Sequence, residues 1–180
     1  MHKLKRILAV LVAIVMLFGS GDAVFAFVPS RIMSDELLKT VDVYDDNLYW
    51  SPYSWYDGKD FKQTVQSGGY VKIAFTGKHL GICVDLAQMS EQFRDNVLLN
   101  AYIDGSDRPI VKKLSDTKDD EIVFSDSLEQ GNHYAIIYLG DSICTMANRW
   151  DVPLQCALRI TGLKLSADAS TVRLDNTRCV

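Results

Sequence analysis

The chain has 180 residues, of which 48% are hydrophobic and 23% are charged, and its formal net charge is −4. A chain of this length buries roughly 68–70% of its unfolded surface, which is enough for one self-sufficient core, so we expect one domain. The negative charge disfavours a nucleic-acid partner, because phosphate binding requires a basic surface.

The first 26 residues have the order of a secretory signal peptide. Three basic residues precede an apolar run from Ile7 to Phe18, which is too short to span a membrane comfortably, and Val24 and Ala26 complete a cleavage site. We expect export, so that the protein is secreted or held in the cell envelope, with an uncleaved amphipathic anchor as the alternative. Cleavage after Ala26 leaves 154 residues with 16 basic and 22 acidic side chains, a net charge of −6.

After the signal peptide we predict a lead-in segment over residues 27–44, a β-sandwich domain over 45–175 and a tail over 176–180. Three weaker elements are a helical turn over residues 34–39 and strands over 45–49 and 61–65. From residue 60 onward, short β-rich runs alternate with turn signals, and no long stretch has the 3.6-residue period of a helix. The chain is therefore predicted to be all-β.

The strongest alternation of apolar and polar residues lies in residues 70–76 and 79–86. Gly77 and Lys78 separate these two runs as a turn, so we predict that the runs form a hairpin. The side chains expected on their inward faces are Val71, Ile73, Phe75, Leu80, Ile82 and Val84.

A second hairpin follows. Residues 97–103 end at the strong turn pair Asp104-Gly105, and residues 110–114 are expected to return as its second strand. Further strands are predicted over residues 121–124, 132–140, 156–165 and 171–174. Short strands at this spacing favour two packed sheets, because each sheet buries its alternating apolar face against the other. We predict a jelly-roll-like antiparallel β-sandwich.

The densest aromatic stretch of the chain is residues 49–57, YWSPYSWYD. Aromatic rings stack on the apolar faces of sugars, and the tyrosine hydroxyl and tryptophan indole groups add polar contacts. The candidate ligand-binding or docking residues here are Trp50, Tyr53, Trp55 and Tyr56. The alternative is a bend at Pro52 whose aromatic side chains seal one end of the sandwich.

A second candidate site lies at residues 149–151, between two predicted strands. Arg149 can stack on an aromatic ring or clamp a carboxylate, and Asp151 can accept hydrogen bonds from hydroxyl groups. We expect Trp150 and Trp55 to lie near one another or on one end of the sandwich, as the exposed part of a recognition surface. The alternative is an Arg149–Asp151 pair that only holds its own loop.

The metal-binding and thiol residues do not point to a cofactor, and we predict neither a cofactor nor a metal ion. Residues 115–121 contain four acidic side chains but lack the residue order of a calcium loop, so a solvated turn is expected. His79 and His133 each stand alone at a strand edge, where turn or surface roles are expected. Export permits disulfides, and Cys144 and Cys156 flank one loop, so we predict a bridge between them, with buried thiols as the alternative.

Gly140-Asp141-Ser142 has the letters of the nucleophile block of GDS-type esterases. A serine acts as a nucleophile only with an oriented base and with hydrogen-bond donors for the oxyanion. No histidine occurs among the 38 residues after Ser142, so we predict a polar turn and no catalytic residue. The alternative is a minimal esterase that uses Ser142.

Several short motifs follow one another along the chain. They are residues 51–55 (SPYSW), 69–77 (GYVKIAFTG), 102–105 (YIDG), 128–133 (LEQGNH), 148–150 (NRW) and 160–165 (ITGLKL). In this order they resemble the N-terminal β-sandwich domain of a bacterial group of SGNH/GDSL-type hydrolases. They are also similar to the N-terminal jelly roll of family-two carbohydrate esterases. The resemblance spans residues 45–169.

The resemblance implies a non-catalytic domain, similar to a carbohydrate-binding module, that packs against an esterase domain. The catalytic domain of that family would begin soon after Leu174, whereas this sequence stops at Val180. We therefore expect a secreted accessory domain that is not an enzyme by itself. Its expected partner is a polysaccharide, a glycoconjugate or an SGNH-type catalytic domain on another chain. The remaining alternative is a structural docking partner of a separately encoded hydrolase.

Overall fold

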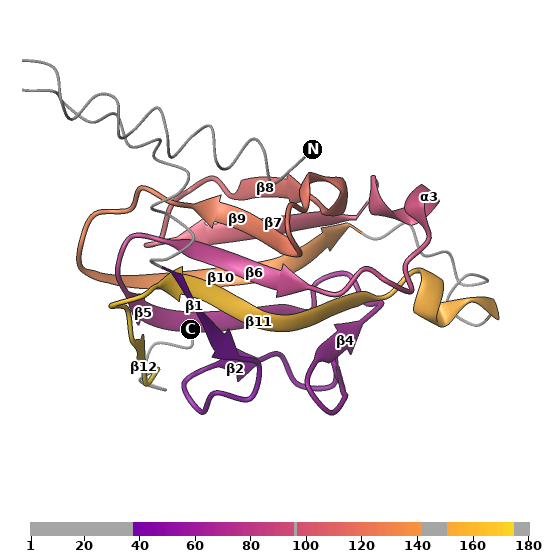
Figure 1. Ribbon diagram of the computed structural model, residues 1–180, viewed down its shortest axis with the longest axis horizontal. Coiled ribbons are helices and arrows are strands. Elements are labelled where there is room, and N and C mark those ends of the chain that lie inside the picture. The colour runs from indigo at the N-terminus through magenta and orange to yellow at the C-terminus, as the bar shows by residue number, and fades with distance from the viewer. Residues whose placement is uncertain (1–37, 96, 142–150, 175–180) are drawn as a thin grey trace, which may run out of the picture. The chain divides into compact units, whose positions relative to one another are not determined.

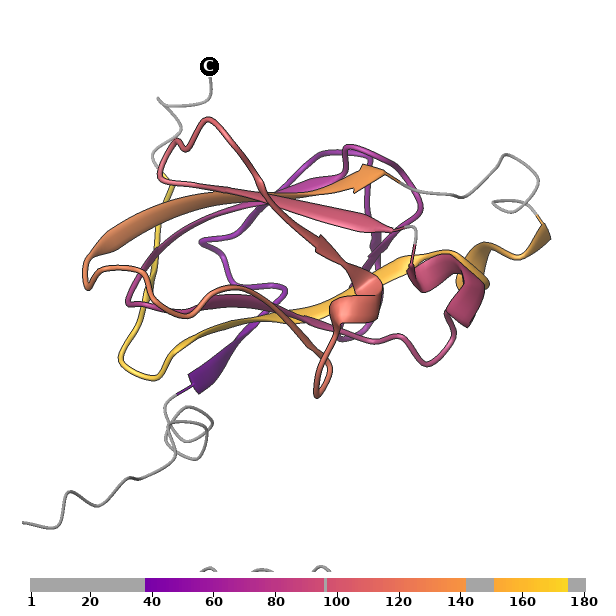
Figure 2. The same ribbon diagram turned by 90° about the horizontal axis from the view of Figure 1, so that it is seen from above.

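Two antiparallel β-sheets pack face to face in this protein, and the layers are seen apart in Figure 2, with β10 in orange and β11 in yellow. The structure, a computed structural model, describes residues 38–95, 97–141 and 151–174. These residues belong to one compact unit, Asp35–Val180. The predicted all-β antiparallel sandwich is confirmed. In the described ranges, no helix is long and apolar enough to cross a membrane.

The first sheet, which we call the β11 sheet, has the hydrogen-bonded order β3-β4-β11-β6-β9, and β1 also pairs with β11 (Figure 1). Its strands are β1 (Leu38–Asp42), β3 (Tyr56–Asp57), β4 (Lys62–Thr64), β6 (Leu80–Val84), β9 (Glu121–Ser125) and β11 (Leu158–Ser166). The strand β9 forms one border of this sheet, and the two-residue strand β3 together with β1, which pairs only with β11, forms the other.

The second sheet, the β10 sheet, has the order β12-β5-β10-β7-β8, and β2 also pairs with β5. Its strands are β2 (Tyr49–Trp50), β5 (Tyr70–Thr76), β7 (Leu98–Ile103), β8 (Ile110–Lys113), β10 (Asn132–Asp141) and β12 (Thr171–Val172). The short helical elements are α3 (Glu91–Arg94), η1 (Leu114–Asp116) and η2 (Pro153–Gln155).

The core lies between the sheets. In β5, alternate side chains are buried because successive residues of a strand point to opposite faces, whereas in β6 every residue except Cys83 is buried. All six side chains predicted to face inward in residues 70–76 and 79–86 are buried, so this prediction is confirmed.

The predicted hairpin between residues 70–76 and 79–86 is wrong. β5 pairs with β10 in one sheet, whereas β6 pairs with β11 and β9 in the other. Gly77, at a φ of 103°, carries the chain between the sheets, and a Cβ there would lie 3.1 Å from the Cβ of Ala169. The alternating pattern therefore identified which side chains of each strand are buried, but not which strand pairs with it. Strands of both sheets turn an apolar face toward the core, so the pattern does not tell the two sheets apart.

The predicted hairpin around Asp104 and Gly105 is confirmed. β7 and β8 pair in antiparallel fashion, with Ala101 opposite Ile110. Asp104 and Gly105 have φ values of 53° and 72°, and a left-handed backbone at both central residues is the conformation that an Asp-Gly turn favours.

The helical turn predicted over residues 34–39 is wrong where the structure describes it. Leu38 and Lys39 belong to β1, which pairs with β11 from Leu38 opposite Ser166 onward. Only Val41 of this strand is buried, so the sequence of β1 has no alternating apolar pattern that would predict a strand. The pairing with β11 determines the conformation of β1. Residues 34–37 lie outside the described residues.

Candidate functional site

The aromatic stretch of residues 49–57 crosses from one sheet to the other at the edge of the sandwich. Trp50 in β2 lies opposite Val71 of β5, whereas Tyr56 in β3 lies opposite Gln63 of β4. We call the aromatic side chains gathered here the aromatic edge. Its members are Tyr44, Trp50, Tyr53, Trp55 and Tyr56.

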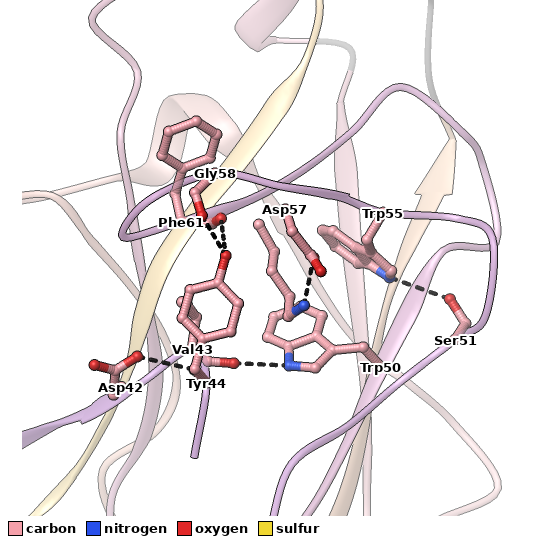
Figure 3. A network of polar contacts seen from close by, with 10 residues as sticks. Asp42, Val43, Tyr44, Trp50, Ser51, Trp55, Asp57, Gly58 and Phe61 are labelled. Atoms are coloured by element: carbon pink, nitrogen blue, oxygen red, sulfur yellow. Dashed lines mark hydrogen bonds and ion pairs between the residues drawn. The ribbon is translucent and has the colours of Figure 1, made fainter. Parts of the chain in front are cut away.

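Two tryptophans form the inner part of the aromatic edge (Figure 3). The rings of Trp50 and Trp55 meet edge to face, with centroids 4.7 Å apart and an interplanar angle of 75°. The Trp50 indole nitrogen donates to the carbonyl of Val43 at 3.0 Å, and both rings pack against the core. Trp55 is half-buried, so it supports the surface and is not the exposed part that the sequence suggested.

Ser51 fixes the second tryptophan and was not predicted as a site residue. Its buried hydroxyl accepts hydrogen bonds from the Trp55 indole nitrogen at 3.1 Å and from the Tyr70 amide at 3.0 Å. The Ser51 amide in turn donates to the Tyr70 carbonyl at 2.9 Å. Since a buried hydroxyl needs such partners, Ser51 anchors the start of the aromatic stretch to β5.

A buried lysine lies beneath the aromatic edge. Lys62 is 8% exposed, and its Nζ lies 2.5 Å from an Asp57 carboxylate oxygen across the β3–β4 pair. The same ammonium group lies 4.8 Å from the centre of the Tyr44 ring and 5.5 Å from that of Trp50. A buried ammonium requires a counter-charge, and the two ring faces add cation–π attraction. Sequence alternation placed residue 62 on a strand but gave no sign of this role.

Tyr44 closes the aromatic edge from the β1–β2 connection. Its hydroxyl donates toward the carbonyls of Gly58 at 2.5 Å and Phe61 at 3.2 Å, which joins it to the turn between β3 and β4 (Figure 3). Partial burial, followed by the nearby carboxylates of Asp57 and Asp42, raises the pKa of the Tyr44 hydroxyl. The hydroxyl therefore remains a neutral donor throughout the physiological range.

Two tyrosines form the outer part of the aromatic edge. Tyr53 is 99% exposed and Tyr56 is 68% exposed. Tyr53 also has a φ of 62°, a left-handed backbone that costs a residue other than glycine of order 1–3 kcal/mol. Because the Tyr53 ring makes almost no contact that would offset this strain, the fold itself does not explain why a tyrosine stands there.

The other predicted site residues are only partly described. Those outside the described residues are Ser142, Cys144, Arg149 and Trp150. Asp151 is exposed and Cys156 is buried. The pairing of Arg149 with Asp151, the proximity of Trp150 to Trp55 and the Cys144–Cys156 bridge therefore stay predictions.

The residues before Ser142 have a structural role. Gly140 and Asp141 are the last residues of β10, where the pairing with β7 shifts register between Leu139 and Asp141. A Cβ on Gly140 would lie 2.0 Å from the side-chain nitrogen of Asn100, so only glycine fits here without rearrangement. A β-bulge against β7 thus accounts for the glycine at position 140.

The prediction of a lone surface histidine is wrong for His79. His79 is buried, and its Nε2 lies 2.6 Å from a carboxylate oxygen of Glu121 on the neighbouring strand β9. A Cβ on Gly81 would lie 2.2 Å from the same oxygen, so the glycine leaves the space through which Glu121 reaches His79. Sequence analysis missed this pair because the two residues lie far apart along the chain.

His133 also has hydrogen-bond partners, at both of its ring nitrogens. Its Nδ1 lies 2.6 Å from an Asp104 carboxylate oxygen, and its Nε2 lies 2.7 Å from the Glu129 carbonyl. Burial lowers the pKa of His133, but the hydrogen bonds to Asp104 and Glu129 outweigh it and raise the pKa above the ordinary value. Both histidines of the sandwich are therefore held by fixed acceptors.

The predicted solvated turn over residues 115–121 is confirmed. Asp119 and Asp120 are exposed and have φ values of 50° and 61°, and Lys118 and Glu121 exchange two backbone hydrogen bonds of 2.9 Å across them. Across the described part of the chain, no three histidine, cysteine or acidic side chains come close enough to hold a metal ion.

Comparison with known proteins identifies the fold. No protein-family model matches the sequence, and no curated protein matches it. A family two carbohydrate esterase from Cellvibrio japonicus shares the fold with a TM-score of 0.57 and 14% sequence identity. An acetyl xylan esterase from the rumen bacterium Butyrivibrio proteoclasticus gives 0.55 and 15%. A family two carbohydrate esterase from Clostridium thermocellum, solved in complex with cellohexaose, gives 0.52 and 10%.

The shared fold covers most of this chain and a minority of each esterase. The matches include 77%, 77% and 72% of this chain, but only 36%, 34% and 34% of the respective esterase chains. The chain therefore spans about a third of the length of these enzymes. It shares its fold with one part of each of these esterases.

Proposed function

We propose that the protein is a secreted, non-catalytic accessory domain that binds polysaccharide through the exposed tyrosines of its aromatic edge. We further propose that its sandwich corresponds to the N-terminal jelly-roll domain of SGNH-type esterases. The observation that carries the proposal is Tyr53, an almost fully exposed ring on a strained backbone, supported by a rigid tryptophan pair. Strain of this kind persists at sites that recognise a ligand.

The chemistry of the aromatic edge suits a neutral sugar chain. Tyr53 and Tyr56 offer exposed ring faces for the apolar side of a sugar ring, and their hydroxyls offer hydrogen bonds. Asp57 follows Tyr56 in the chain, and its side chain is 63% exposed, so its carboxylate can also accept a hydrogen bond from a sugar hydroxyl. Since acidic side chains outnumber basic ones in the chain, a neutral polysaccharide is favoured over an acidic one.

We propose that the domain is not catalytic because both of its histidines already have hydrogen-bond partners within the fold. An esterase serine needs a base, and His79 and His133 are the only histidines after residue 26. His79 is held by Glu121, and His133 is held by Asp104 and Glu129. Both ring nitrogens of His133 are hydrogen-bonded, and His79 is buried with its Nε2 on Glu121, which supports the proposal that ester hydrolysis belongs to a separate catalytic domain.

The proposal is tested by separating binding from folding. Tyr53→Ala and Tyr56→Ala are compared with the parent protein by calorimetric titration with cellohexaose and acetylated mannan, and by thermal unfolding. We expect each variant to weaken binding at least tenfold, as truncation of an aromatic contact of about 1.4 kcal/mol or more does, with an unchanged melting temperature. Val111→Ala, an exposed apolar residue on β8, is the control. Equal affinity in all proteins would refute the proposal.

The catalytic alternative is tested on the same preparation. The parent and Ser142→Ala are assayed on a short acyl ester, and we expect no turnover by either protein. Turnover by the parent that disappears in the variant would replace the accessory-domain proposal with the minimal esterase.

A second candidate function is docking onto an esterase catalytic domain. It is favoured by the esterase chains that share this fold, which are about three times as long as the shared part. An exposed aromatic surface serves such an interface as well as a sugar. Titration with a separately expressed SGNH-type catalytic domain distinguishes the two functions, because only docking predicts binding that Tyr53→Ala weakens in the absence of sugar.

Export is proposed from the signal-peptide pattern of residues 1–26. When the full chain is expressed in a bacterium, we expect the mature protein outside the cytoplasm with an N-terminus at Phe27. N-terminal sequencing of the fractionated protein checks this expectation. Full-length protein that remains in the cytoplasmic fraction would contradict it.

A further inference from the structure

A cavity of about 620 Å³ lies where β6 ends, and no sequence motif pointed to it. Its volume falls within the roughly 300–1,000 Å³ of small-molecule sites. We call it the β6 pocket. The polar residues that line it and that bear on its chemistry are Asp85, Ser115, Thr117, Asp119, Asp120 and Thr161.

The walls of the β6 pocket are held in place by hydrogen bonds. One guanidinium nitrogen of Arg94, which also lines the pocket, donates to the carbonyls of Leu86 at 3.0 Å and Met89 at 3.1 Å. Elsewhere in the lining, the Val84 amide donates to the Asp120 carbonyl at 2.9 Å. A cavity whose walls are fixed in this way is formed before a ligand arrives, which lowers the entropic cost of binding.

The lining favours a neutral ligand rich in hydroxyl groups. The carboxylates of Asp85, Asp119 and Asp120 repel an anion and accept hydrogen bonds from hydroxyls. A hydrogen bond from the Ala87 amide, together with Arg159, lowers the pKa of Asp85, so this carboxylate remains an acceptor at neutral pH. The lining also includes the exposed side chain of Ala87, whose apolar methyl group suits the carbon face of a sugar ring.

A row of side chains on the outer face of the β11 sheet joins the β6 pocket to the aromatic edge. Tyr56 of β3 lies opposite Gln63 of β4, and Gln63 lies opposite Arg159 of β11. Direct partners in a sheet share one face, so these three side chains point the same way. Arg159 continues the row to Asp85, with its Nη1 at 2.7 Å from the carboxylate, and Asp85 lines the pocket.

The middle of this row is rigid. The other Nη atom of Arg159 donates to the side-chain oxygens of Gln63 and Gln88, both at 3.1 Å. The guanidinium carbon lies 4.1 Å from the centre of the Phe61 ring. These contacts hold the planar Arg159 guanidinium in one position between the two ends of the row.

We propose that the outer face of the β11 sheet binds one extended, neutral polysaccharide chain, which stacks on Tyr56 at one end and places a sugar ring in the β6 pocket at the other. This inference rests on the proposed function and extends it to a second subsite. From Tyr56 to Asp85 the row crosses three inter-strand spacings, roughly 14 Å, which is longer than one sugar ring. Long oligosaccharides therefore reach both ends, whereas a disaccharide reaches one.

The test removes the pocket carboxylates and varies the length of the sugar chain. Asp119→Asn/Asp120→Asn is the pocket variant, because asparagine tolerates the left-handed backbone of both positions. The matched control is Asp107→Asn/Asp168→Asn, which makes the same charge change at exposed acids outside the pocket lining. The probes are the disaccharides and hexasaccharides of the cello and manno series, titrated calorimetrically into each full-length protein.

We expect the pocket variant to weaken binding of the hexasaccharide about tenfold and to leave disaccharide binding unchanged, while the control matches the parent. Thermal unfolding confirms that all proteins are folded. If the pocket variant binds the hexasaccharide as tightly as the parent while Tyr56→Ala does not, the β6 pocket is not a subsite and the proposed function stands. If the parent binds neither series, the proposed function and this inference both fail.

Discussion

The inner and outer parts of the aromatic edge are both built from aromatic side chains, but they stand in opposite relations to the fold. Trp50 and Trp55 meet the core, and their indole nitrogens are hydrogen-bonded within the domain. Tyr53 and Tyr56 extend into solvent from the same short segment. An aromatic cluster in a sequence can therefore serve stability and recognition at once, and only the contacts of each ring tell which of the two it serves.

The largest expected effect is that of Trp50→Ala. The substitution removes the contact with Trp55 and the ring over which the Lys62 ammonium lies. We expect it to lower the free energy of unfolding by about 3 kcal/mol, at the low end for a tryptophan, because Trp50 is only half-buried. Urea unfolding measures this, with Tyr53→Ala as the control on the outer part. A Trp50→Ala protein as stable as the parent would abolish the distinction between inner and outer rings.

A smaller effect is expected at the buried lysine. Asp57→Asn leaves the Lys62 ammonium without its counter-charge, and we expect a loss of about 1 kcal/mol, reduced by the solvent exposure of Asp57. In Lys62→Met the charge is absent, so adding Asp57→Asn to it should cost almost nothing. A double-mutant cycle measured by urea unfolding checks this coupling, and additive effects would contradict it.

At Tyr53 we expect a substitution to stabilise the fold, whereas the two preceding substitutions destabilise it. Asparagine tolerates the left-handed backbone that strains tyrosine, so Tyr53→Asn should raise the free energy of unfolding by about 0.5 kcal/mol while polysaccharide binding is lost. Unfolding and titration of one preparation reveal both changes. Tyr56→Asn, in the extended strand β3, is the control in which no stabilisation is expected. A destabilised Tyr53→Asn would show that the ring supports the fold.

The smallest effect concerns His133, which lies outside the aromatic edge. Its pKa is raised in the folded state, so its contribution to stability is fully present below the unfolded pKa of about 6.5 and is lost as pH rises through the folded pKa. We expect His133→Gln to remove under about 0.5 kcal/mol at about pH 5 and less at about pH 9. Equal losses at both pH values would indicate a role independent of charge.

Sequence reasoning succeeded where one strand determines its own pattern. In residues 70–76, strict alternation identified the buried side chains, and Asp104-Gly105 fixed the following hairpin through its turn chemistry. It failed where a second segment decides the outcome. β5 and β6 follow one another in the chain but belong to different sheets, and β1 is a strand because β11 pairs with it.

The candidate site was found only in outline. The aromatic stretch was visible because aromatic residues concentrate there, but the division between supporting tryptophans and exposed tyrosines depends on which ring meets the core. Lys62 looked like an ordinary strand residue, since its counter-charge and ring partners come from other segments. The β6 pocket was missed for the same reason, because several separate segments line it.

The outer strands of both sheets have a further consequence for how the domain meets other molecules. Six strands of the described sheets pair on one side only, and four of them are short: β2, β3 and β12 have two residues each, and β8 has four, including Lys112 and Lys113. Long, flat outer strands recruit foreign chains by continuing the sheet, whereas brevity and positive charge suppress that reaction. At these borders the domain is protected against aggregation. A macromolecule that binds there is expected to do so through side-chain contacts and not by adding a strand to the sheet.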